Sequence, residues 1–295
     1  MQAGDYLLQN FAIFVNLGET DSPLPEALEM ILLFESEMEK HADLIRPVRS
    51  YADIEQNQAD GVMSALLTGE EGEITMGNPD FLYFLYKLGM RMMTLTWNYE
   101  NSLGFPNVRL DKKSSASSDR YCLSQNKGLK EQGIVFLEEM ERLGMIIDVS
   151  HLSDAGFYDV LEHTTNPFVA SHSNARALAR HPRNLTDEMI RALAERGGVA
   201  GINYYAPFLK DADKKMPLHG LCSDMVAHMK HMKQVGGIGC IGLGSDFDGI
   251  DTATDMKDCS GMQLLADVMS REGFTTGEIE AVFHDNVLRV YRELL

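Results

Sequence analysis

Hydrophobic and polar residues follow two alternating patterns along this chain. Short, mostly apolar runs predict buried strands at residues 11–16, 61–67, 91–97, 145–150, 167–171, 198–205 and 238–244. Longer stretches repeat apolar residues at helical spacing and predict helices at residues 23–45, 79–88, 129–143, 155–163, 184–196, 218–234, 261–271 and 276–294. Apolar strands that alternate with amphipathic helices predict a parallel α/β sheet.

The number of strand–helix units favours a closed TIM-like (β/α)8 barrel over an open doubly wound sheet. The pattern gives seven strands, whereas such a barrel has eight. Residues 1–10 cannot hold a strand and its helix, so either one strand escapes the pattern or the chain starts one βα unit late. We expect a single barrel domain over residues 1–295, N-terminally truncated and missing the first βα unit.

The net charge indicates which partners to expect, and the cysteines indicate the cellular compartment. The chain has 26 basic and 44 acidic residues, a net charge of −18. Nucleic acids and anionic membranes require a basic face, so neither is an expected partner and a small molecule is favoured. The four cysteines form no C-x-x-C pair, no apolar run has the length of a membrane span, and no secretory leader is visible. We therefore expect a soluble, cytoplasmic protein.

Side chains suited to a divalent metal follow four of the predicted strands, namely Glu70, His151, His172 and Asp246. Imidazole and carboxylate are ligands that zinc prefers, and the carboxyl ends of parallel strands meet at one edge of a sheet. The alternative interpretation is that each histidine is only a hydrogen-bonded residue at a strand end. This would account for one such histidine, but accounts less well for a matching set of four residues. Glu71 and Glu73 compete with Glu70, which lies closest to its strand.

Other motifs are weaker. Asp246 and Asp248, followed by Gly249, also suit an aspartate-nucleophile phosphatase, although that motif normally follows the first strand and here it follows the last. Arg183 could bind a carboxylate through two hydrogen bonds, or be a surface arginine before a helix. Tyr204 and Tyr205 end a strand, so one should face the pocket and the other the helices. The polar stretch 98–118 is long enough for an active-site loop.

Several linked motifs resemble the signature segments of the membrane (renal) dipeptidase family, the M19 zinc peptidases. These motifs are residues 147–151, 170–174, 182–184 and 244–249, and residues 91–98 resemble bacterial members in particular. The resemblance covers the chain from about residue 4 onward. It implies a (β/α) barrel with two zinc ions bridged by a glutamate and a hydroxide, a dipeptide substrate and a homodimer.

The resemblance also implies roles for individual residues. Glu70 would bridge the ions, His151 and His172 would ligate one zinc, Asp246 would handle protons at the other, and Arg183 would bind the substrate's terminal carboxylate; Tyr205 and Asn98 are further substrate-binding candidates. The implied activity is zinc-dependent hydrolysis of small dipeptides by a metal-activated hydroxide.

Two features depart from the family pattern. No His-x-Asp motif, which supplies ligands of the first zinc site, precedes Phe11, and we expect that the chain starts at an internal methionine. Trp97 stands where mammalian members have a histidine near the substrate carbonyl, so oxyanion assistance from this position is not implied. With only the remaining ligands the chain would hold one zinc. The alternative function is an inactive or metal-depleted remnant, or a binding protein of the same fold.

Overall fold

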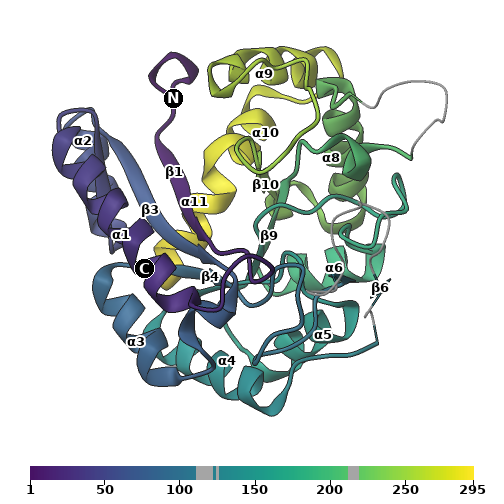
Figure 1. The fold of residues 1–295 in the computed structure, drawn as a ribbon. Coiled ribbons are helices and arrows are strands. Elements are labelled where there is room, and N and C mark those ends of the chain that lie inside the picture. Colours follow the sequence, from purple (N-terminus) through teal and green to yellow (C-terminus); the bar gives the residue numbers. More distant parts are fainter. Residues whose placement is uncertain (111–121, 124–125, 212–218) are drawn as a thin grey trace. The chain divides into compact units, whose positions relative to one another are not determined.

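The computed structural model describes residues 1–110, 122–123, 126–211 and 219–295 (Figure 1). Residues 111–118 of the predicted active-site loop lie outside this part of the chain. The fold comprises two compact units, which we describe separately. The N-terminal unit contains Leu7–Asn166 with Leu294–Leu295, and the C-terminal unit contains Met1–Tyr6 with Pro167–Glu293.

The N-terminal unit is built on a parallel sheet. Its strands β1 (Leu8–Phe14), β3 (Met63–Glu70), β4 (Met92–Thr94) and β7 (Ile146–Asp148) are hydrogen-bonded in that order. Strand β2 (Ile45–Val48) pairs with the first half of β3, with Ile45 opposite Met63, whereas β4 pairs with its last three residues. Two short strands, β5 (Val108–Arg109) and β6 (Cys122–Leu123), form an antiparallel pair.

The described residues of this unit also form five α-helices and a 3-10 turn: α1 (Pro23–Lys40), α2 (Tyr51–Ala59), η2 (Gly72–Thr75), α3 (Pro79–Leu88), α4 (Glu131–Leu143) and α5 (Asp154–His163). Helix α2 lies beside β3 in Figure 1. Local sequence sets several helix starts. Ser50 and Asp53 form a capping box before α2, and Ser153 accepts a hydrogen bond from Gly156 N before α5. Such caps satisfy N–H groups that have no partner within the helix.

The predicted helix 23–45 is too long, because α1 ends at Lys40 and the chain then forms β2 and α2, which the sequence pattern did not predict. Strand β2 buries only its two end residues, Ile45 and Val48, and contains a proline, so it shows neither an apolar run nor an alternation. The sequence pattern therefore missed β2, which pairs with β3 on the same side as β4 and lies off the path β1–β3–β4–β7. The other predicted strands and helices of this unit are confirmed, with ends shifted by a few residues.

Within its described residues, the C-terminal unit contains three parallel strands in the order β8 (Val169–Ala170), β9 (Val199–Ile202) and β10 (Ile241–Leu243). Its helices are α6 (Asp187–Glu195), α7 (Ala206–Leu209), α8 (Cys222–Gly236), α9 (Met262–Arg271), α10 (Thr276–Glu280) and α11 (Asn286–Leu294), with a π-helical turn, η5 (Ala281–Asp285), between the last two. Short 3-10 turns are η1 (Gln2–Gly4), η3 (Ile238–Cys240) and η4 (Cys259–Gly261). The predicted strand 198–205 ends at Ile202, so the two tyrosines lie beyond it, and α7 was not predicted.

Two glycines allow strands β9 and β10 to approach the residues that follow β8. A Cβ atom on Gly201 or on Gly244 would collide with the carbonyl oxygen of Ser171, and one on Gly244 would also lie 3.0 Å from His172 Cα. Only glycine fits such close backbone contacts. Gly201 and Gly244 therefore allow close packing against the segment that contains His172.

Within residues 1–110, 126–211 and 219–295, no helix is both long and apolar enough to cross a bilayer.

Candidate metal centre

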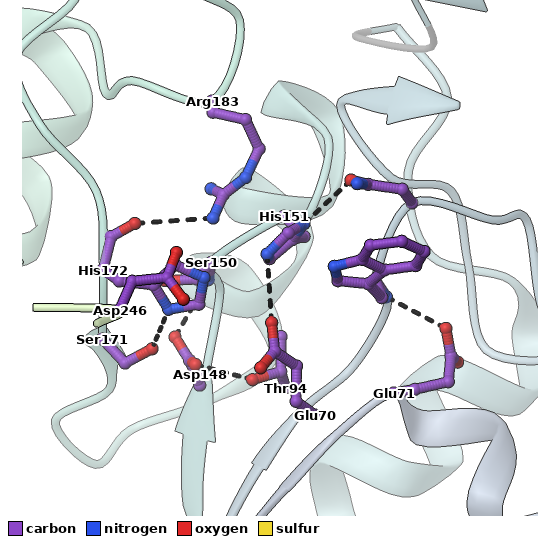
Figure 2. A network of polar contacts seen from close by, with 12 residues as sticks. Glu70, Glu71, Thr94, Asp148, Ser150, His151, Ser171, His172, Arg183 and Asp246 are labelled. Carbon is purple, nitrogen blue, oxygen red and sulfur yellow. Dashed lines mark hydrogen bonds and ion pairs between the residues drawn. The ribbon is translucent and has the colours of Figure 1, made fainter. Parts of the chain in front are cut away.

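Glu70 and His151 face each other in the N-terminal unit. Glu70 is the last residue of β3 and His151 follows the end of β7 by three residues. The distance between Glu70 Oε1 and His151 Nε2 is 3.2 Å, and Figure 2 shows the two side chains pointing toward one another. His151 is buried and Glu70 is half-buried, so this contact is partly shielded from water.

The ring of His151 is oriented by its other nitrogen. Nδ1 lies 2.9 Å from Asn98 Oδ1, which can only accept a hydrogen bond, so Nδ1 carries a proton. The His151 backbone has a left-handed conformation with φ of 69°, and its carbonyl oxygen accepts a hydrogen bond from Asn107 N at 2.7 Å. Left-handed backbone is uncommon outside glycine and is frequent at functional positions.

The position of this proton determines what the His151 ring presents to Glu70. With the proton on Nδ1, a neutral His151 presents the Nε2 lone pair to the Glu70 carboxylate. Two acceptors at this distance require either a proton between them or a cation bound to both atoms. Two ligand atoms at about 2.0–2.1 Å in a tetrahedral zinc site lie about 3.3 Å apart, close to the observed 3.2 Å. The donor set therefore fits a divalent metal.

Glu71 has a different environment from Glu70, although the two are adjacent in sequence. Its carboxylate is fully buried and accepts hydrogen bonds from Glu73 N at 2.9 Å, Trp97 N at 3.1 Å and Asn101 Nδ2 at 2.5 Å. Burial raises the pKa of Glu71 to about 7. Glu73 accepts a hydrogen bond from Ser102 N at 2.6 Å. Among these three glutamates, Glu70 is the one that faces His151.

Asp148 is a buried acid that the sequence did not single out. It is 1% exposed, and its carboxylate accepts hydrogen bonds from Thr94 Oγ1 at 2.7 Å and Ser150 N at 2.9 Å (Figure 2). A charged residue inside an otherwise apolar strand run was the available signal, because such a residue is seldom fully buried without partners. Asp148 ties the ends of β4 and β7 together beneath His151.

In the C-terminal unit, His172 follows β8 and is buried. Its Nδ1 lies 2.7 Å from Ser171 Oγ. The guanidinium of Arg183 donates long hydrogen bonds of 3.4 Å to the His172 carbonyl oxygen and to Ser173 Oγ, and it lies over the ring of Phe208. Arg183 is only 3% exposed, so the alternative of a surface arginine is excluded.

His181 lies next to this arginine and is held neutral. Its Nδ1 accepts a hydrogen bond from Arg183 N at 3.2 Å, and its ring packs on Phe208. Burial, together with the charges of Arg183 and Arg176, lowers the pKa of His181 to about 4.

Asp246 also has left-handed backbone, with φ of 59°, and its carboxylate is held by an amide. Asn203 Nδ2 donates to Asp246 Oδ2 at 3.0 Å, while Asn203 Oδ1 accepts from Tyr205 N at 2.7 Å. Tyr204 is fully buried, whereas Tyr205 is half-buried, and burial raises the pKa of Tyr205. Asn203 was not predicted, because nothing in the strand pattern separates it from its neighbours.

The candidate residues thus fall into two sets, one in each unit. The N-terminal set contains Glu70, His151 and Asn98, joined by direct contacts. The C-terminal set contains Asp246 and Tyr205, joined through Asn203, and His172 with Arg183, joined through the His172 backbone.

Comparisons with known proteins agree with one another. A family model described as membrane dipeptidase (peptidase family M19) matches residues 1–294. The chain is 32% identical over 253 residues to an uncharacterized protein from the pqqA 5′ region of Klebsiella pneumoniae, covering 86% of this chain and 90% of that protein. It is 35% identical over 210 residues to an uncharacterized dipeptidase of Schizosaccharomyces pombe, covering 70% of this chain and 47% of that protein. The chain thus spans about half the length of this fungal relative.

A solved structure extends the comparison to the fold. The crystal structure of dipeptidase AC, a metallopeptidase of family M19, is 27% identical to this chain with a TM-score of 0.85, and the likeness covers 100% of this chain and 87% of that one. The predicted α/β fold of the TIM-like (β/α) barrel type is therefore confirmed.

Proposed function

The chain belongs to the membrane dipeptidase family, peptidase family M19, and we propose that it is a zinc-dependent dipeptidase that hydrolyses the peptide bond of small dipeptides. The observation that carries this proposal is the contact of Glu70 with His151, in which a carboxylate and a ring nitrogen face each other at 3.2 Å and require a cation or a proton between them. Family membership favours the metal ion over the proton.

We assign metal ligation to Glu70 and His151 in the N-terminal unit and to His172 and Asp246 in the C-terminal unit. These are the nitrogen and oxygen donors that zinc prefers. The family resemblance implies two zinc ions in the complete centre, and Glu70 as the residue they share. When bound, zinc lowers the pKa of a coordinated water and polarises the peptide carbonyl.

The remaining roles belong to side chains of this chain. Asp246 takes a proton from the attacking water on its carboxylate and passes it to the departing amine, as a positioned general acid–base. Arg183 binds the terminal carboxylate of the dipeptide, because a guanidinium in buried surroundings offers two parallel donors in a fixed plane. Tyr205 and Asn98 are proposed to line the substrate site.

Metal removal tests the proposal. The protein is stripped with a chelator, reloaded with Zn²⁺, and assayed against a panel of L,L and L,D dipeptides by detection of the released amine. We expect hydrolysis that disappears on stripping and returns with Zn²⁺, together with bound zinc measured by elemental analysis. Zinc-loaded protein that binds dipeptides in calorimetry without hydrolysing them would favour the alternative of a non-catalytic binding protein.

Three further predictions accompany this function. We propose one metallo-dependent hydrolase domain for the chain, supported by a family model that extends over residues 1–294. The cytoplasmic location and the homodimer stay predictions, to be checked by cell fractionation and by light scattering.

A further inference from the structure

Glu71 combines two unusual properties directly beside a proposed metal ligand. It is completely buried, and its backbone has φ of 118°. Burial of a carboxylate is costly, and positive φ strains any residue that has a Cβ. Both features persist only where the surrounding structure determines them, which is typical of functional positions.

The contacts of Glu71 lead into one loop. Its Oε2 accepts the hydrogen bond from Trp97 N, and its Oε1 accepts the one from Asn101 Nδ2. Asn101 in turn donates to Leu95 O at 2.8 Å and accepts hydrogen bonds from Leu103 N and Gly104 N. A single buried carboxylate therefore fixes both ends of the segment 97–101.

That segment carries Asn98, whose side chain orients His151. The contacts form a closed ring that starts and ends where β3 ends. Glu70, the last residue of β3, faces His151, which is hydrogen-bonded to Asn98. Trp97, the neighbour of Asn98, donates a hydrogen bond to Glu71, which follows Glu70. Figure 2 shows Glu70 and Glu71 directed to different sides of the strand end. The indole of Trp97 also lies beside the His151 ring, with centroids 6.2 Å apart.

We propose that Glu71 is a positioning residue of the metal centre, which holds the segment 97–101 so that Asn98 keeps the proton on His151 Nδ1 and directs Nε2 to the metal. This inference rests on the proposed function, because that function requires a metal ion bound to His151. Outer-shell partners that fix a histidine in this way typically change metal affinity or activity by about 10–100-fold when mutated.

The test makes the same Glu→Gln substitution at two positions, Glu71 and Glu73. Glu71→Gln keeps the shape of the side chain but places an NH₂ group toward Trp97 N, where no hydrogen bond can form between two donors. Glu73→Gln is the matched control, since its remaining carbonyl oxygen can still accept from Ser102 N. Zn²⁺ affinity is measured by competition with a chelator, well below the melting temperature, and Co²⁺ absorption spectra report ligand geometry.

We expect about tenfold weaker Zn²⁺ binding and an altered Co²⁺ spectrum for Glu71→Gln, the lower end of the outer-shell range because Glu71 acts through Asn98. Glu73→Gln should behave as wild type. Equal affinities in both variants would overturn the proposal. If Glu71→Gln does not fold, Glu71→Gly replaces it, because glycine tolerates the positive φ and also lacks the carboxylate; wild-type affinity in a folded Glu71→Gly protein would likewise overturn it.

Coupling with Asn98 shows whether Glu71 acts through it. Asn98→Leu removes the acceptor and should weaken Zn²⁺ binding about 10–100-fold, whereas Asn98→Asp keeps an acceptor and should restore most of the affinity. Adding Glu71→Gln to Asn98→Leu should cause no further loss, and additive losses would contradict the proposal. The ¹⁵N chemical shifts of His151 in metal-free protein give a readout that does not depend on zinc. A wild-type protein that binds no Zn²⁺ contradicts the proposed function, while an unchanged His151 tautomer in Glu71→Gln contradicts this inference.

Discussion

In both units an asparagine side chain orients a proposed functional residue, but different chemical groups hold the two asparagines. In each unit a proposed catalytic or metal-binding residue, His151 in one and Asp246 in the other, follows a short strand with left-handed backbone. In each unit an asparagine side chain fixes the orientation of that residue, Asn98 for His151 and Asn203 for Asp246. The repeated combination of positive φ and an amide contact indicates that orientation is controlled at both positions.

The units differ in how the asparagine itself is held. Asn98 lies on a loop whose position depends on the buried carboxylate of Glu71. Asn203 directly follows β9 and is held by the neutral amide of Asn174, through Asn203 N to Asn174 Oδ1 and Asn174 Nδ2 to Asn203 O, both at 2.9 Å. Orientation therefore depends on a buried carboxyl group in the N-terminal unit and on an amide in the C-terminal unit.

The largest effects should come from the charged residues of each set, and they should differ in kind. Glu70→Gln removes a carboxylate ligand, so Zn²⁺ affinity should fall by more than the about 10–100-fold that outer-shell changes cause. Asp246→Asn removes a general acid–base, so kcat should fall by about 10²–10⁴-fold, with a smaller loss of affinity. Chelator competition and steady-state kinetics on both variants measure the two quantities. An equal loss of affinity in both would show that the two units share metal binding evenly.

A smaller effect is expected from the amide of the C-terminal unit. Asn203→Leu leaves Tyr205 N without its acceptor and Asp246 without its donor, and a buried group left in this way costs about 1–3 kcal/mol of unfolding free energy. Turnover should fall as well, because Asp246 loses its orientation.

Asn57→Leu is the control for that variant, since it removes a buried hydrogen bond from the Asn57 amide on α2 to Ser64 Oγ on β3. Denaturant unfolding should show comparable destabilisation of both variants, and only Asn203→Leu should lower kcat. If Asn57→Leu lowers kcat equally, the effect of Asn203 is one of stability alone.

Some residues of the two sets could be predicted from the sequence, whereas the contacts that orient them could not. Glu70, His151, His172 and Asp246 could be named because each follows an apolar run, and helix α3 has the predicted bounds 79–88, with Asn78 and Gly89 as its caps. The contacts of Asn98 and Asn203 depend on how loops return to a strand end, and no periodicity encodes that path. Asn98 was predicted as a substrate-binding residue, which stays a prediction, and its contact with His151 was not predicted.

Burial of polar groups was the other feature that the sequence did not reveal. Glu71, Asp148 and Arg183 are at most 3% exposed, although charged residues are usually found at the surface. Their partners come from distant segments, such as Asn101 for Glu71 and Thr94 for Asp148. Strand β2 was missed for a related reason, since its pairing with β3 rather than its four residues makes it a strand.

The smallest expected effect is a pH dependence of stability in the C-terminal unit. The buried charge is negative around Glu70 but positive around Arg183, next to His181. The folded state holds the pKa of His181 at about 4 instead of 6.5, so the unfolded chain binds more protons between these values and stability falls as the pH drops through this range. The full shift corresponds to about 3 kcal/mol, and partial exposure of the ring reduces the expected loss to about 1–2 kcal/mol. His181→Asn keeps an acceptor for Arg183 N and does not titrate, so its unfolding free energy, measured on metal-free protein from pH 7 to 4, should decline less steeply than that of wild type. Parallel slopes would mean that other groups carry the acid sensitivity of the C-terminal unit.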